Sequence, residues 1–289
     1  MNIAAFRSQL TGAARLALQW RLLLVWLLAL LLPLLVALLP LWVTLAAVLD
    51  RAPLAQQLLD RFDVAVLADT LMSLGPRGYS AASGLGALVC LLLLMPWLSG
   101  TVIAAGRAAH RGEPTLKFSA LLKGGLLEYG AMARLLVWAV LPLGLAAGLG
   151  GAIVHGAGEY AQKMLLEADA NRLNYAALGV AALLFLLAHA TVDAARAQLV
   201  LEPRRRSVIK AWWRGTRGLL RQPARIVLVL LLTLAGLAAV AVLGWLRTQV
   251  APVGVFSFVL ALLLGQALVL ALVWQRCARV LGLVLAGRG

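Results

Sequence analysis

The chain has 289 residues, of which 63% are hydrophobic and only 13% are charged, yet its formal net charge is +15. About a quarter of the residues of a soluble domain are charged, so the composition excludes an ordinary soluble globular protein. Because high apolarity coexists with strong positive charge, the basic and apolar residues must occupy separate segments of the chain.

Six long windows contain no Asp, Glu, Lys or Arg: residues 22–49, 78–106, 135–158, 173–192, 226–246 and 248–275. Each reaches the roughly 20 residues that a helix needs to cross about 30 Å of hydrocarbon. Barrel strands are excluded because they alternate in polarity over about ten residues, whereas these windows are uniformly apolar. The sequence therefore predicts an all-α fold, a single domain over residues 1–289 that forms a polytopic bundle of six transmembrane helices.

The first window, residues 22–49, is much longer than the roughly 7–15 apolar residues of a cleaved signal peptide. We therefore expect it to be a retained first span. The segment that follows, residues 50–82, has partial helical spacing of apolar residues and several acids. We expect a short amphipathic helix there, packed as a lid on the outer face.

Positive charge is distributed unequally between the connections. Twenty of the 26 basic residues, but only four of the 11 acids, lie in the segments 1–21, 107–134, 193–225 and 276–289. Short loops rich in Lys and Arg stay in the cytoplasm. The pattern predicts six spans with both termini cytoplasmic. The Leu, Ala and Arg bias of the composition indicates a bacterial gene, so we expect the membrane to be a bacterial inner membrane.

The most basic connection, residues 202–225, also contains a pair of tryptophans, Trp212 and Trp213. Its cations Lys210, Arg214, Arg217 and Arg221 recur at helical spacing and form one stripe. Apolar side chains lie largely opposite this stripe: Val208, Ile209, Trp212, Leu219 and Leu220, together with Thr216.

A basic stripe opposite an apolar face predicts a helix lying in the membrane interface. Its partners would be anionic lipid head groups, each cation contributing about 1 kcal/mol near the surface. A nucleic-acid partner is disfavoured because no recognised nucleic-acid-binding motif accompanies the charges. The alternative is that these cations only determine topology.

Three stretches of the chain resemble one another. Arg21, Arg134 and Arg225 each form the last charge before a span, after a mildly amphipathic basic segment. Residues 101–114 and 191–203 also match, since both begin with Thr-Val, contain an Ala pair and close with Glu-Pro.

We therefore expect three repeated units, approximately 1–113, 114–203 and 204–289. Each would consist of a cytoplasmic interfacial helix and a transmembrane hairpin. Gly124 and Gly215 take the same place in the second and third units. Because every unit begins on the same side, the repeats would be parallel, unlike the inverted repeats of many secondary transporters.

Residues that could carry chemistry are few. Cys90 and Cys277 lie in different spans, and the three histidines show no metal-ligand spacing. No catalytic motif is present, so we expect no metal site, no cofactor and no enzymatic activity. The glycines Gly144, Gly148 and Gly151 predict close helix packing rather than a nucleotide loop.

The strongest candidate for a polar intramembrane site is His189 with Asp193, one helical turn apart, and Gln266 in the sixth span. Ionisable groups in membrane segments are often functional, so a proton relay or a polar-substrate contact is one reading. The other, which we favour, is a structural pair in which Asp193 binds Arg196 or a base of the next interfacial helix.

The repeated layout, with the exit sequence Asp-Ala-Ala-Arg at residues 193–196, resembles uncharacterised six-helix bacterial inner-membrane proteins. It is also similar to the membrane domain fused to some glycerophosphodiester phosphodiesterases. The likeness is one of layout, and no phosphodiesterase domain accompanies it, so that activity is not implied.

We expect a non-enzymatic accessory or scaffold subunit that contacts anionic lipids and a cytoplasmic or membrane protein partner. The alternative is a transporter or permease subunit for a small or amphipathic solute. A water-filled cavity at His189, Asp193 and Gln266 would favour the transporter, whereas a closed bundle would favour the scaffold. Polar side chains converging at one membrane face would favour a third class, a lipid-modifying enzyme.

Overall fold

The computed structural model describes residues 3–49, 81–113, 115–164, 166–202, 207–250 and 254–287. The lid expected at residues 50–82 lies almost wholly outside these ranges, as do residues 203–206. All regular secondary structure in the described ranges is helical. In chain order the helices are α1 (Ile3–Ala17), α2 (Trp20–Leu49), α6 (Ala81–His110), α7 (Phe118–Leu127), α8 (Tyr129–Ala161), α9 (Glu167–Leu201), α10 (Val208–Arg221), α11 (Pro223–Gln249) and α12 (Val255–Ala286).

Six of these helices are long and apolar enough to cross a membrane: α2, α6, α8, α9, α11 and α12. In lipid a spanning segment must pair its own backbone groups, which is why continuous apolar runs become helices. The prediction of an all-helical fold with six candidate spans is confirmed for the described residues. The fold is consistent with a multi-pass membrane protein.

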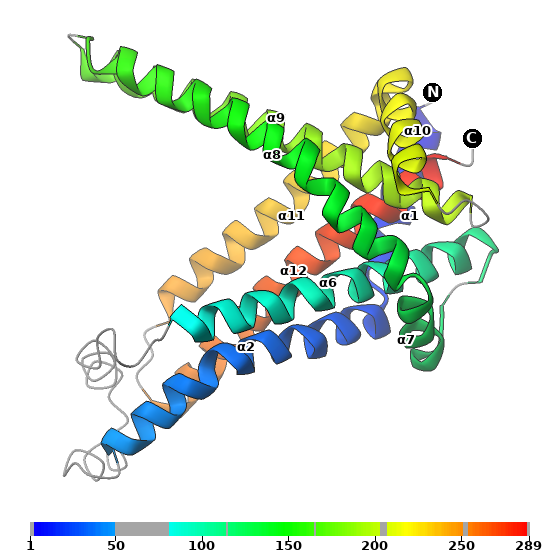
Figure 1. Cartoon of the computed structure of the whole chain (residues 1–289), viewed down its shortest axis with the longest axis horizontal. Helices are drawn as coiled ribbons and strands as arrows, with labels where there is room; N and C mark the ends of the chain where they lie inside the picture. Colours follow the sequence, from blue (N-terminus) through cyan, green and yellow to red (C-terminus); the bar gives the residue numbers. More distant parts are fainter. Residues whose placement is uncertain are drawn as a thin grey trace.

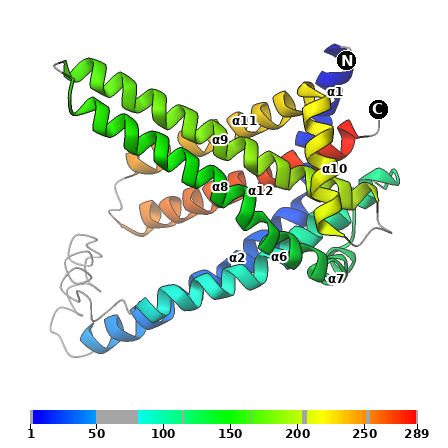
Figure 2. The ribbon, with the colours of Figure 1, turned by 45° about the horizontal axis from the view of Figure 1, so that its top comes forward.

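The long helices form three antiparallel hairpins, α2 with α6, α8 with α9 and α11 with α12. The hairpins diverge from one end of the molecule, where the short helices α1, α7 and α10 lie with the end of α12 (Figures 1 and 2). We call this end the hub. It comprises α1, α7 and α10 with the C-terminal parts of α6, α9 and α12.

Each short helix in the hub packs against the second helix of a hairpin. Helix α7 packs on α6, α10 packs on α9, and α1 packs on α12, so the N-terminal helix meets the C-terminal one. Glycines allow two of these contacts to be very close. A Cβ built on Gly215 of α10 would lie 2.7 Å from the carbonyl carbon of Ala194, and one on Gly125 of α7 would lie 2.8 Å from the carbonyl oxygen of Trp97.

The core of the molecule lies at the hub. Buried side chains are concentrated in the C-terminal parts of α6, α9 and α12, and Trp26, Leu98, Ile103, Val192, Val200 and Leu281 are among the largest of them. Away from the hub the apolar side chains are largely exposed; Leu145 of α8 is 66% exposed and Leu263 of α12 is 58% exposed. Exposed apolar surface of this extent is what a lipid-facing protein presents.

The expectation of close packing at the glycines of α8 is wrong for the three residues on which it was based. A Cβ on Gly144, Gly148 or Gly151 would meet nothing within 4 Å. Only their neighbour Gly150 faces a partner helix closely, with Ala181 of α9 3.0 Å away. The reason is geometric, because α8 has only one close neighbour along this part of a diverging hairpin and presents its other faces outward.

Candidate functional site

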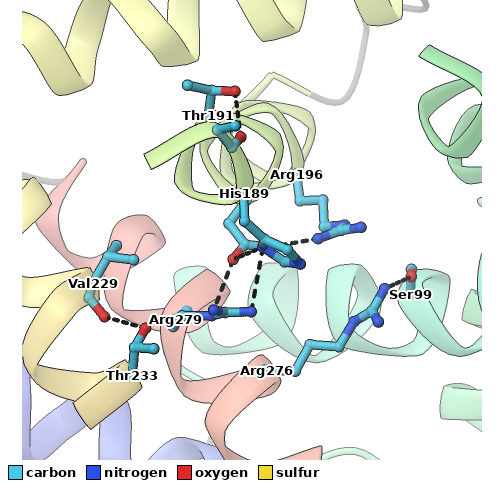
Figure 3. Close-up of polar contacts among 10 residues, drawn as sticks. Ser99, His189, Thr191, Arg196, Val229, Thr233, Arg276 and Arg279 are labelled. Carbon is cyan, nitrogen blue, oxygen red and sulfur yellow. Dashed lines mark hydrogen bonds and ion pairs between the residues drawn. The ribbon is translucent and has the colours of Figure 1, made fainter. Parts of the chain in front are cut away.

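The most polar buried site in the described chain surrounds Asp193, in the hub part of α9. The side chain of Asp193 is fully buried. Arg196, almost one turn later on α9, forms an ion pair with the Oδ1 atom of Asp193. Arg279 of α12 places its Nε atom 3.1 Å from the other oxygen, Oδ2. Figure 3 shows the side chains of Arg196 and Arg279 approaching the region beside His189 from two helices.

His189 completes this group one turn before Asp193. Its Nδ1 atom lies 3.3 Å from Oδ2 of Asp193 and 3.4 Å from Nη2 of Arg279. Both carboxylate oxygens are therefore occupied by cationic or ring-nitrogen partners. A carboxylate held in this way stabilises the contact between α9 and α12. Because both of its oxygens already have partners, neither oxygen is free to accept a proton as a base.

A third guanidinium, that of Arg276, lies one turn before Arg279 on α12. Its Nη2 atom donates to Ser99 Oγ of α6 at 3.4 Å, and its guanidinium carbon lies 5.5 Å from the centre of the Trp26 ring. Within the described ranges no carboxylate lies within ion-pair distance of it. Arg276 therefore joins α6 and α2 to α12, and its own charge has no carboxylate partner among the described residues.

The other carboxylates of the hub are already matched. Glu128, between α7 and α8, lies 2.5 Å from Arg107 of α6, which also donates to the carbonyl of Leu199. Glu202, after α9, lies 2.8 Å from Arg214 of α10. Arg196 and Arg279 therefore share Asp193, whereas Arg276 has no carboxylate partner in the described ranges. The described side chains at the centre of the hub thus carry excess positive charge.

The structure brings together only two of the three residues predicted to form an intramembrane site. His189 and Asp193 lie side by side, but Gln266 lies about 20 Å along α12 from Arg279, by the rise of a helix. The buried amide of α12 is instead Gln275, whose Nε2 atom donates to the carbonyl of Thr233 in α11 at 3.0 Å. Gln266 is therefore not part of the site at Asp193.

The predicted pairing of Asp193 with Arg196 is confirmed, whereas the alternative partner, a basic residue of the short helix α10, does not contact Asp193 among the described residues. The cation that reaches Asp193 from another helix is Arg279, which belongs to the long helix α12. Arg276 and Arg279 lie beyond the last charge-free window of the sequence, yet both belong to α12. Arg279 is only 8% exposed. The signal in the sequence was the apolar stretch that continues beyond them, residues 280–286.

The six residues predicted to bind lipid all lie on α10, and they differ in exposure. Lys210, Arg217, Arg221 and Trp213 are exposed, whereas Arg214 is half-buried against Glu202. Trp212 faces the protein, where its Nε1 atom donates to Thr191 Oγ1 at 3.0 Å and its ring packs edge-on against Trp138.

Three faces can be distinguished on α10. Val208, Ala211, Gly215 and Leu219 are buried, mainly against α9. An exposed apolar face carries Ile209, Trp213 and Leu220, which are 55%, 63% and 74% exposed. The third face carries the exposed cations. A helix with this arrangement can contact protein, hydrocarbon and head groups at the same time.

No group of three or more metal-ligating side chains occurs in the part of the chain that the structure describes. No protein-family model, curated protein or solved structure matches the chain. The interpretation of the site therefore depends on its own geometry.

Proposed function

We propose that the chain is a non-enzymatic scaffold or accessory subunit of a bacterial inner membrane. In this proposal both termini and the hub face the cytoplasm, and the chain consists of three parallel repeats. The recurring order of one short and two long helices supports the repeats, as does the packing of each short helix on the second helix of a hairpin. The exposed cations of α10 would bind anionic head groups, and a cytoplasmic or membrane protein partner would dock at the same end.

The observation that carries this proposal is the closure of the hub around Asp193. The buried carboxylate is fixed by Arg196 and His189 of its own helix and by Arg279 of α12, which joins α9 to α12. Arg107 and Glu128 join α6 to the start of α8. A path for a polar solute needs polar groups that face water. Here His189, Asp193, Arg196 and Arg279 bind one another, which supports a rigid scaffold over a transporter.

The transporter alternative can be tested by cysteine scanning of α12. In a background with Cys90 and Cys277 replaced by alanine, single cysteines are introduced at successive positions from 262 to 275. Each variant in sealed vesicles is treated with a small, charged thiol reagent from either side. A scaffold predicts that positions near the middle of α12 do not react, because they face lipid or the protein core.

A stripe of reactive positions at helical spacing, running from Gln266 towards the hub, would contradict the scaffold and favour the transporter. Gln222, which is exposed between α10 and α11, provides the positive control when replaced by cysteine. The same control shows whether the reagent has reached the hub side of each preparation.

A further inference from the structure

A lateral pocket lies between the first hairpin and α12. Its volume is about 680 Å³, and its walls come from α2, α6 and α12. The lining is aliphatic over most of its length, with Leu30, Leu34, Leu88, Leu91, Val269 and Leu272 among its residues. Leu34, Leu88 and Leu272 are 44%, 50% and 50% exposed, so the pocket opens on the apolar surface of the molecule.

Arg276 is the one charged side chain among the described residues that line this pocket. Its guanidinium lies at the hub end, beside Trp26 and Ser99. From Trp26 to Leu34 along α2 the pocket extends about 12 Å away from the hub, by the rise of a helix. It therefore has a cationic end near the hub and an apolar end nearer the middle of the bundle.

The charge of the site is not balanced by the residues that the structure describes. Arg276 has no carboxylate partner in the described chain, and the nearby Asp193 is already shared by Arg196 and Arg279. Charges taken out of water are normally paired, because an isolated charge in an apolar environment is costly. Guanidinium groups bind phosphates strongly, through charge-assisted and often bidentate hydrogen bonds.

We propose that this pocket binds an anionic phospholipid. The phosphate pairs with the guanidinium of Arg276, and one acyl chain lies along the aliphatic wall between α2, α6 and α12. The volume and the few polar groups are typical of a ligand site. The inference goes beyond the proposed function, because the site is formed by residues of other helices than α10.

Native mass spectrometry of the delipidated full-length protein in detergent tests this assignment. The protein is titrated with phosphatidylglycerol, with phosphatidylcholine of the same acyl chains, or with inorganic phosphate alone. We expect one phosphatidylglycerol to bind more tightly than phosphatidylcholine, and inorganic phosphate not to compete at equal concentration. Arg276→Gln should weaken phosphatidylglycerol binding about tenfold or more and abolish the preference.

A second variant, Ala87→Trp, fills the pocket and keeps Arg276, so it should also weaken binding. The matched controls are Arg172→Gln, which removes a cation of α9 that is 82% exposed, and Ala152→Trp, at an exposed position of α8. Both should bind phosphatidylglycerol as the wild type does. If Arg276→Gln does not fold, Arg276→Lys, which keeps the charge, is used in its place. Arg276→Lys should weaken phosphatidylglycerol binding less than Ala87→Trp does.

Wild-type affinity in both Arg276→Gln and Ala87→Trp would overturn the proposal. Equal affinity of the wild type for the two lipids, or complete competition by inorganic phosphate, would also overturn it. The combined variant Lys210→Gln, Arg214→Gln, Arg217→Gln and Arg221→Gln should keep the site intact. Failure of the lipid contact proposed for α10 can therefore be told apart from failure at Arg276.

Discussion

Replacing Asp193 with alanine is expected to lower the free energy of unfolding by about 3–5 kcal/mol, the cost of leaving buried charges unpaired. The carboxylate is fully buried and is the ion-pair partner of Arg196 on its own helix and of Arg279 on α12. Without it, two guanidinium groups face each other in the centre of the hub. The measurement is unfolding of the purified protein in mixed micelles, followed by circular dichroism against increasing denaturing detergent.

Asp169→Ala is the matched control. Asp169 also forms an ion pair with an arginine on α9, Arg172, but its side chain is half exposed. Exposed pairs contribute about 0–1 kcal/mol, so this variant should unfold nearly as the wild type does. Equal and small effects of the two alanine variants would show that Asp193 does not hold the hub together.

Partial recovery is expected when Arg279 is removed together with Asp193. In the double variant Asp193→Ala, Arg279→Leu, one of the two uncompensated cations is replaced by an apolar side chain. Replacing a buried ion pair by well-packed apolar groups is often close to neutral. The double variant should therefore be more stable than Asp193→Ala alone.

Gly215→Ala is expected to destabilise the packing of α10 on α9 by about 1–3 kcal/mol, the usual cost of overfilling a packed site. The new Cβ would lie 2.7 Å and 2.8 Å from the carbonyl carbon and oxygen of Ala194. These are backbone atoms inside a helix, so α10 must move away as a whole. Hydrogen exchange measured by mass spectrometry should show faster exchange in α10 and in the facing part of α9.

Gly218→Ala provides a control within the same helix. Its Cβ would meet only the end of the flexible Arg225 side chain, 3.3 Å away. Alanine favours a helix over glycine by roughly 1 kcal/mol, so this variant should be neutral or slightly more stable. A Gly215→Ala protein as stable as Gly218→Ala would contradict the close contact between α10 and α9.

The six candidate spans could be predicted because their cause is local. A run of apolar residues long enough to cross hydrocarbon must satisfy its own backbone, whatever the rest of the chain does. The His189–Asp193 contact could also be predicted, since residues one turn apart in a helix are neighbours. Both predictions need only one segment of sequence.

The rest of the site depends on which helices meet. Arg279 reaches Asp193 only because α12 packs against α9 at the hub, and no feature within either helix indicates that pairing. Gln266 and Gln275 are both glutamines of α12, but only Gln275 lies near the hub, where it is buried and donates to α11. The direction of each α10 tryptophan is also decided by packing, which turns Trp212 towards Thr191 and leaves Trp213 exposed.

The central claim is that the basic hub faces the cytoplasm while the hairpins cross the membrane away from it. The most direct test uses two matched variants, Gln222→Cys at the hub and Gln162→Cys at the turn after α8, in the background without native cysteines. Both glutamines are exposed and follow the end of a helix. Intact spheroplasts are treated with a membrane-impermeant maleimide before lysis. We predict labelling at position 162 and protection at position 222 until the membrane is opened; labelling at 222 in intact spheroplasts, or equal labelling of both positions, would contradict the account.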